Sequence, residues 1–299
     1  MREKKKINQQ WLFHYGEIGM PKKTAKKAHA LGGLTAPLKE EKGESVAYGA
    51  GGEHFLKLIA QGDEIQGLKN LAGTDLDSGI DQNWQTITIP HDWKISQSYK
   101  QAPELLMSGS KEDGVGYYRK TFSLNDELMN QKRVILHFDG VMRSADVWLN
   151  GAYLGQNTSG YTSFSYDISE VARYGNEGVN VLLVRVDTTT GAEGWWYEGA
   201  GIYRDVWLEF VPLIAFDREN AYVYTQELQE TQAVMGAEVC IENYSQKIVE
   251  VSPVIRINEQ LITLGKQTLQ PFEKRVLKET FIFSTPIPWS PENPHLYES

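Results

Sequence analysis

Two adjacent residues in the motif Pro90–Trp93 are candidates for acid–base chemistry. His91 and Asp92 stand side by side there, and a histidine paired with a carboxylate can transfer a proton. No serine or cysteine nucleophile motif accompanies the pair in the sequence. Aspartate is also common in tight turns, because its side chain accepts hydrogen bonds from nearby backbone N–H groups. We therefore interpret the motif as a turn that Asp92 caps and Trp93 anchors.

Asp187 is the second candidate. It ends the apolar run NVLLVRVD and is followed by three threonines and a glycine. An aspartate at the end of a strand can accept hydrogen bonds from the turn that follows it. It can also be a carboxylate on a rigid edge that accepts hydrogen bonds from sugar hydroxyls. The residues alone favour the turn, and both interpretations stay open at this point.

Other acidic residues offer less. Glu193 and Glu198 suggest a carboxylate pair, but their glycine-rich surroundings are poorly suited to hold a rigid acid and nucleophile. Asp113 lies in the segment KEDGVGYYRKTF, directly before the first of two glycines that let the backbone pass close to another group. The residues by themselves suggest an exposed turn at Asp113. The single cysteine, Cys240, lies in an apolar run and is expected to be a small core residue.

The elements that must position these residues are strands. Between Arg133 and Val211 the sequence repeatedly alternates apolar and polar residues, as in VILHF, ADVWL and NVLLVRVD. Asn150-Gly151 separates two such runs and tolerates the positive φ angles of a tight hairpin. No capped run with helical periodicity interrupts this stretch. The pattern predicts an antiparallel β-sandwich.

A second β pattern follows Val211-Pro212, where the proline ends the strand ladder. Strand-like runs recur up to the end of the sequence and suggest an immunoglobulin-like sandwich without its cysteine pair. We therefore expect two domains, residues 1–213 and residues 214–299. Within the first, residues 16–83 show little strand pattern and are expected to be a loop insertion that can border a substrate cleft.

Composition excludes several classes of protein. The net charge of −9 and the sequence pI of about 5.3 argue against nucleic-acid binding, which needs clustered positive charge. The lysines at positions 4–6 are expected to be a solvated face or a floppy arm. Neither a signal peptide nor an apolar run of membrane-spanning length is recognisable. We expect a soluble, cytoplasmic protein that binds neither nucleic acid nor membrane.

Several segments in order resemble one family. FDGVMRSADVWLNGAYLG, SGYTSFSYDIS, NVLLVRVD and WWYEGAGIYRDVWL resemble the N-terminal sugar-binding domain of glycoside hydrolase family 2, and within it the β-galactosidase type. PWSPENPHLYES resembles the end of the immunoglobulin-like domain that follows in this family. The resemblance implies an all-β chain, with a jelly-roll, galactose-binding-like β-sandwich before an immunoglobulin-like β-sandwich.

The resemblance also implies roles for single residues. At the place of Asp187 the family has an aspartate that reaches into the catalytic pocket, where it helps to hold the galactosyl unit and a nearby monovalent cation. Asp113 stands where the best-known members carry an amide side chain that also reaches the active site. The change from amide to carboxylate leaves the binding role and the exposed-turn role of Asp113 equally open. Some relatives also use magnesium, but no cofactor is expected within this chain.

In this family the catalytic glutamates belong to a (β/α)8 barrel that follows these domains and performs retaining hydrolysis of glycosides. The 299 residues show no strand–helix alternation that could form such a barrel. We therefore expect the non-catalytic N-terminal portion of a β-galactosidase-like enzyme. It would be inactive alone, and it would support the barrel and shape one wall of its active site.

Two rival functions remain open. A free carbohydrate-binding module would bind a galactoside through an exposed aromatic platform, and a scaffold would show a wide apolar face and no affinity for sugar. The segment from Trp195 to Tyr203 distinguishes these functions. We expect this segment to pack at a seam with a neighbouring domain and not to be a platform.

Overall fold

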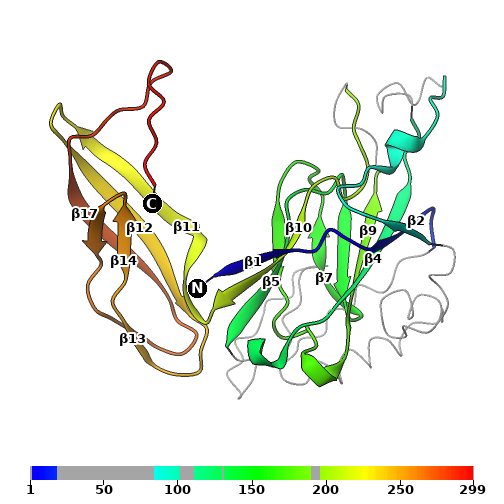
Figure 1. Ribbon diagram of the computed structural model, residues 1–299, viewed down its shortest axis with the longest axis horizontal. Helices are drawn as coiled ribbons and strands as arrows, with labels where there is room; N and C mark the ends of the chain where they lie inside the picture. Colours follow the sequence, from blue (N-terminus) through cyan, green and yellow to red (C-terminus); the bar gives the residue numbers. More distant parts are fainter. Residues whose placement is uncertain (1, 19–83, 102–110, 130, 190–195, 299) are drawn as a thin grey trace. The chain divides into compact units, whose positions relative to one another are not determined.

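The computed structural model describes residues 2–18, 84–101, 111–129, 131–189 and 196–298. The chain divides into two compact units, Met1–Val211 and Pro212–Ser299 (Figure 1). The described part is built of strands, with short 3-10 turns η3 (Trp93–Ser96), η5 (Asp126–Leu128) and η6 (Gly175–Glu177) between them. Within the described residues no helix is long and apolar enough to cross a membrane.

The first unit is a jelly-roll sandwich of two antiparallel sheets (Figure 1). The six-stranded sheet has the order β3-β2-β4-β9-β6-β7. Its strands are β2 (Trp11–Tyr15), β3 (Gln85–Ile87), β4 (Val115–Phe122), β6 (Ala145–Leu149), β7 (Ala152–Asn157) and β9 (Asn180–Asp187). The four-stranded sheet has the order β1-β10-β5-β8. Its strands are β1 (Glu3–Lys6), β5 (Lys132–Phe138), β8 (Phe164–Asp167) and β10 (Val206–Pro212).

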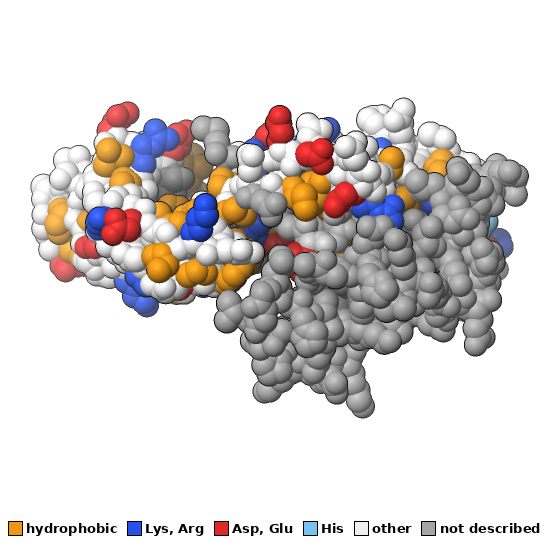
Figure 2. Space-filling model, turned by 90° about the horizontal axis from the view of Figure 1, so that it is seen from below, with side chains coloured by type: hydrophobic (Ala, Val, Ile, Leu, Met, Phe, Trp, Pro, Cys, Tyr) orange, Lys and Arg blue, Asp and Glu red, His pale blue; other side chains and the backbone are white. Residues whose placement is uncertain are grey.

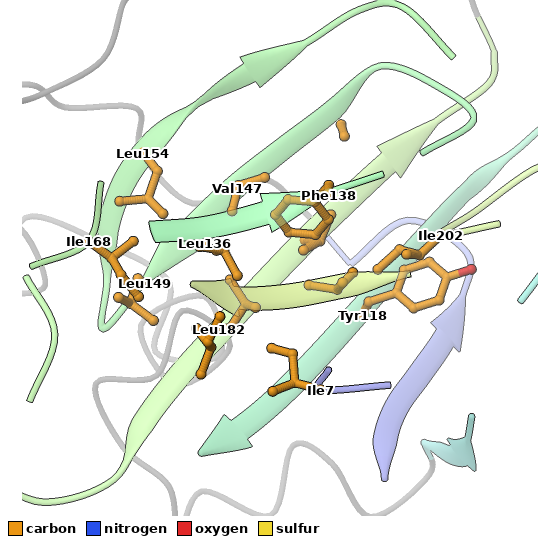
Figure 3. Close-up of a cluster of buried hydrophobic side chains, with 14 of the residues drawn as sticks. Ile7, Tyr118, Leu136, Phe138, Val147, Leu149, Leu154, Ile168, Leu182 and Ile202 are labelled. Carbon is orange, nitrogen blue, oxygen red and sulfur yellow. The ribbon is translucent and has the colours of Figure 1, made fainter. Parts of the chain in front are cut away.

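The core of this unit follows from the predicted alternation. Leu136 and Phe138 of β5 are fully buried and lie among Val147 and Leu149 of β6 and Leu182 of β9 (Figure 3). Burying one such side chain contributes about 1.5–3 kcal/mol relative to leaving it exposed. The strand predictions for this stretch are therefore confirmed.

Local sequence also sets the turns and edges. Asn150 and Gly151 have φ angles of 51° and 86° and close the β6–β7 hairpin, as predicted. Lys4 and Lys6 lie on the exposed strand β1, with their ammonium groups 4.4 and 4.7 Å from the centre of the Trp207 ring. Lys4 and Lys6 are therefore part of a solvated strand face, as predicted. The second lysine cluster of the sequence, at positions 22, 23, 26 and 27, lies outside the described residues.

The second unit is an immunoglobulin-like sandwich. Its main sheet has the order β11-β12-β17, formed by β11 (Ile214–Leu228), β12 (Gln232–Asn243) and β17 (Lys274–Ser284). Two further pairs are β13 (Val249–Val251) with β16 (Gln267–Leu269), and β14 (Val254–Ile257) with β15 (Gln260–Thr263). A small core contains Val239, Ile241, Leu264, Leu269 and Leu277. Cys240 is 7% exposed, as expected for a small core residue. In the view of Figure 2, exposed hydrophobic side chains of this unit are interspersed with charged ones.

Candidate functional site

Asp187 is the last residue of β9, in the middle of the six-stranded sheet. Its backbone N–H donates to the carbonyls of Arg143 and Ser144 at 3.1 and 3.3 Å. The next residue, Thr188, donates its N–H to the carbonyl of Gly114 at 3.0 Å. The strand end is thus fixed between the start of β4 and the turn before β6. Asp187 therefore lies on a rigid edge, as the sugar-binding interpretation of the sequence requires.

The carboxylate of Asp187 is held on both oxygens. Oδ1 accepts hydrogen bonds from the N–H and the hydroxyl of Thr189 at 2.8 and 2.6 Å, and Oδ2 lies 3.1 Å from Nη2 of Arg185. Burial by itself raises the pKa of Asp187, but the hydrogen bonds from Thr189 and the charge of Arg185 outweigh it and lower the pKa. A carboxylate offers about four acceptor positions, so the group has capacity for a further donor such as a hydroxyl.

Hydrogen bonds to Tyr117 and Glu17 fix Arg185. Nη2 of Arg185 also donates to Glu17 at 2.8 Å, and Nε donates to the hydroxyl of Tyr117 at 3.3 Å. Tyr117 in turn donates to Glu17. Burial and the bond to Glu17 raise the pKa of Tyr117 to about 12, so its hydroxyl keeps its proton. Arg185 and Glu17 were not predicted as site residues from the sequence. The one signal for Arg185 was its charge within the apolar strand β9.

Asp113 lies at the same rim as Asp187. It precedes Gly114, whose N–H donates to the hydroxyl of Thr188 at 3.0 Å. Nζ of Lys94 lies 2.6 Å from Oδ1 of Asp113. The side chain of Lys94 is 1% exposed and that of Asp113 is 25% exposed. Asp113 is therefore a half-buried partner of a buried lysine and not a freely exposed turn residue. Its neighbour Gly114 is hydrogen-bonded to Thr188, the neighbour of Asp187, so the two candidate aspartates lie on adjoining strand ends.

The Pro90–Trp93 motif is the turn that the sequence predicted. Oδ1 of Asp92 accepts the backbone N–H groups of Lys94 and Ala200, each at 2.9 Å. Trp93 is 4% exposed. The ring of His91 contacts the hydroxyl of Tyr118 at 2.8 Å, and burial lowers the pKa of His91 against the opposing charge of Asp92. The motif is thus a structural turn with a neutral histidine.

The aromatic segment after β9 is only partly described. Trp195 and Glu193 lie outside the described residues. Trp196 and Tyr197 are 59% and 43% exposed, whereas Glu198 is buried. Glu198, which we judged with Glu193 a poor candidate for a catalytic pair, is buried, and Glu193 lies outside the described residues.

A third cluster belongs to the second unit. Asp217, Cys240 and Glu242 present ligand atoms within 4.8 Å of one another, and this is the one group of this kind among the described residues. Lys274 already forms an ion pair with Glu242, and burial raises the pKa of the Cys240 thiol. Metal binding needs the thiolate, and Lys274 already occupies Glu242, so we assign no metal centre to this cluster. Asp187 belongs to no such group in the described chain.

Comparisons with known proteins agree with this architecture. The model of the glycosyl hydrolases family 2 sugar binding domain matches residues 63–212, and a second model of glycosyl hydrolases family 2 matches residues 219–299. The chain is 33% identical over 223 residues to a beta-galactosidase of Bacteroides ovatus, covering 73% of this chain and 26% of that protein. It is 31% identical over 220 residues to a putative beta-glucuronidase of Formosa agariphila, covering 73% of this chain and 21% of that protein.

Solved structures show the same fold. A beta-glucuronidase of Bacteroides uniformis aligns with a TM-score of 0.66 and 22% identity, over 99% of this chain and 30% of that one. A putative beta-galactosidase of Bacteroides fragilis aligns with a TM-score of 0.63 and 21% identity, over 99% of this chain and 38% of that one. The chain thus spans between a fifth and two fifths of the length of these proteins.

Proposed function

Because the chain belongs to glycosyl hydrolases family 2, we propose that it is the non-catalytic portion of a retaining, β-galactosidase-like enzyme and shapes one wall of its active site. The catalytic acid and the nucleophile then belong to a (β/α)8 barrel, the partner of this chain in the complete enzyme. By itself the chain does not hydrolyse glycosides. The proposal rests chiefly on Asp187, whose carboxylate is fixed on the sheet rim and keeps capacity for a hydroxyl donor.

The charge state of Asp187 supports binding and not acid catalysis. A retaining glycosidase needs one carboxyl group that keeps a proton near neutral pH. The pKa of Asp187 is lowered by its hydrogen bonds and by Arg185, so this group is a carboxylate throughout the neutral range. A carboxylate accepts strong hydrogen bonds from hydroxyl groups. We assign Asp187 to holding the glycosyl unit, and Asp113 on the same rim to a second contact with it.

We propose a β-galactoside as the substrate class, because the sequence resembles the β-galactosidase type and the chain is 33% identical to a beta-galactosidase of Bacteroides ovatus. The two residues assigned to the sugar, Asp113 and Asp187, are each paired with a cation, Lys94 and Arg185. These ion pairs balance the charges of both aspartates, so charge does not select between a neutral galactoside and a β-glucuronide. The names of the relatives include both activities.

The monovalent cation that the family resemblance implies is not supported by this chain alone. A hard cation needs several oxygen ligands. The described residues offer it the carboxylate of Asp187, and Arg185 already lies against one of its oxygens at 3.1 Å. We therefore assign no cation site within this chain and derive no step from one.

Binding of methyl β-galactopyranoside to the purified chain mixed with the (β/α)8 barrel portion of a family member, followed by NMR, tests the role of Asp187. Asp167 is a matched control, because it also accepts the N–H of a residue two positions later and also pairs with an arginine. We expect saturable binding by the mixture that Asp187→Ala abolishes and Asp167→Ala leaves unchanged. Equal affinity of the mixtures with Asp187→Ala and with the unchanged chain would contradict the proposal, and saturable binding by the chain alone would favour a carbohydrate-binding module instead.

A further inference from the structure

Arg185 lies among three carboxylates on one face of the six-stranded sheet. Strand β9 runs between β4 and β6, so Arg185 has Tyr117 of β4 opposite it on one side and Asp146 of β6 on the other. Side chains that lie opposite each other in an antiparallel pair are close enough to interact. Nη2 of Arg185 also lies 2.8 Å from Glu17 and 3.1 Å from Asp187. One guanidinium is thus shared among the carboxylates of Glu17, Asp146 and Asp187.

Asp146 is a buried group that the proposed function does not use. It is 1% exposed, and it accepts a hydrogen bond from the hydroxyl of Tyr153 at 2.8 Å. Arg185 is itself buried. Attraction between opposite charges is stronger in the protein interior than in water, because the effective dielectric constant is lower there. Without a further constraint, the guanidinium would therefore be drawn toward Asp146 as well as toward Asp187.

The hydroxyl of Tyr117 supplies this constraint. It accepts a hydrogen bond from Nε of Arg185 at 3.3 Å and donates its own proton to Glu17. Burial and the bond to Glu17 raise the pKa of Tyr117 to about 12, so the hydroxyl remains a donor over the neutral range. The ring is fully buried in a cluster with Trp148 and Leu183, and this packing sets the position of the hydroxyl. Because a guanidinium is planar, an acceptor that fixes Nε also fixes the direction of Nη2.

We propose that Tyr117 is a positioning residue for sugar binding, which acts through Arg185 on the carboxylate of Asp187. Its hydroxyl keeps Nη2 of Arg185 against Oδ2 of Asp187, and the carboxylate retains acceptor positions for a sugar hydroxyl. This inference rests on the proposed function and adds to it a residue that does not touch the sugar. If Tyr117 only filled space, its ring would be sufficient and its hydroxyl would have no effect on binding.

Tyr117→Phe removes the hydroxyl and keeps the ring. When the variant chain is mixed with the (β/α)8 barrel portion of a family member, the KM for a chromogenic β-galactoside should rise about two- to tenfold, the effect of losing one hydrogen bond. The kcat should change by less than about twofold, because a contact that is equally strong in the ground state and the transition state acts on KM. Tyr174→Phe is the matched control, because Tyr174 is also buried and its hydroxyl donates to the carbonyl of Ser169 at 3.0 Å. The control should leave both constants unchanged.

A second measurement needs neither sugar nor barrel. NMR of the carboxyl carbons in the purified chain, with labelled aspartate, follows the titration of Asp187, whose signal is the one missing from Asp187→Ala. Burial raises the pKa of Asp187, but the hydrogen bonds from Thr189 and the charge of Arg185 lower it below 3.8. Tyr117→Phe loosens Arg185 and should therefore raise this pKa toward 3.8, whereas Tyr174→Phe should leave it unchanged. A circular dichroism spectrum checks the folding of each variant.

The two measurements separate the positioning role from the proposed function. An unchanged pKa of Asp187 in Tyr117→Phe overturns the positioning role, whatever the kinetics show. Turnover that Asp187→Ala abolishes, together with an unchanged KM in Tyr117→Phe, also overturns it and leaves the proposed function intact. A rise in KM of the same size in Tyr174→Phe overturns it too, since any buried tyrosine hydroxyl would then have this effect. Turnover that survives Asp187→Ala overturns the proposed function, and the positioning role with it.

Discussion

The Arg185→Gln substitution removes the positive charge that pairs with the carboxylate of Asp187. Nη2 of Arg185 lies 3.1 Å from Asp187 and 2.8 Å from Glu17. Removing one partner of a buried ion pair costs about 3–5 kcal/mol. The side chain of Glu17 is 51% exposed and that of Asp187 is 17% exposed, so water compensates mainly Glu17. We therefore expect a loss of about 2–3 kcal/mol, since only part of the network becomes uncompensated.

Thermal unfolding followed by tryptophan fluorescence measures this loss. All tryptophans except Trp289 lie within residues 1–211, so fluorescence reports chiefly on the first unit. For a unit of this size, a loss of about 2–3 kcal/mol lowers the midpoint by roughly 4–12 °C. Arg133→Gln is the control, because Arg133 forms a similar bond of 2.8 Å to Asp167 at a more exposed position. It should cost less than about 1 kcal/mol.

The effect of Arg185→Gln should also depend on pH. The pKa of Asp187 is lower in the folded chain than its ordinary value of 3.8. The stabilisation that the Asp187 carboxylate contributes to folding is therefore complete above pH 3.8 and is lost as the pH falls through the folded-state pKa. The difference in the free energy of unfolding between Arg185→Gln and the unchanged chain should shrink in that acidic range. Equal destabilisation by the two arginine variants, or a gap that persists at acidic pH, would refute the assigned role of the network.

Two further predictions concern the turn beneath the rim. Gly201 and Gly178 have similar φ angles of 118° and 111°. A Cβ added at Gly201 would lie 2.1 Å from the hydroxyl of Tyr118, whereas a Cβ added at Gly178 would meet nothing within 4 Å. In urea unfolding, Gly178→Ala should lower the free energy of unfolding by about 1–2 kcal/mol, and Gly201→Ala should lower it clearly more. Equal losses would contradict the close packing at Gly201. Burial lowers the pKa of His91 from 6.5 in the folded chain. As the pH falls below 6.5, His91 is therefore protonated first in the unfolded chain, so the free energy of unfolding decreases until the pH has passed the folded-state pKa. His91→Gln should flatten the urea-midpoint profile in that window, and an unchanged profile would show that His91 is not responsible.

Local pattern predicted much of the first unit. The alternation in VILHF predicted the buried face of β5 that contains Leu136 and Phe138. In ADVWL it predicted the face with Val147 and Leu149, but all five residues of β6 are buried, because Trp148 packs in a second cluster on the other face. Asn150-Gly151 predicted the hairpin, because the positive φ angles of a tight turn depend on the turn residues themselves. The position of Asp187 at a strand end could be predicted because the apolar run before it is also a local pattern.

The environment of Asp187 was not visible in the sequence. Arg185 and Glu17 are separated by 168 positions, and only the folded sheet brings them together. Asp167 shows why local sequence alone cannot single out Asp187: it makes nearly the same contacts with its own turn and arginine. The two aspartates differ in their tertiary neighbours, since Asp187 adjoins the Gly114–Thr188 contact that leads to Asp113.

Hydrolysis of a chromogenic β-galactoside tests the central claim most directly. The purified chain is assayed alone and then mixed with a separately produced (β/α)8 barrel portion of a family member. We predict no turnover by the chain alone and turnover by the mixture, which Asp187→Ala abolishes and Asp167→Ala preserves. Turnover by the chain alone, or activity of the mixture that survives Asp187→Ala, would contradict the account.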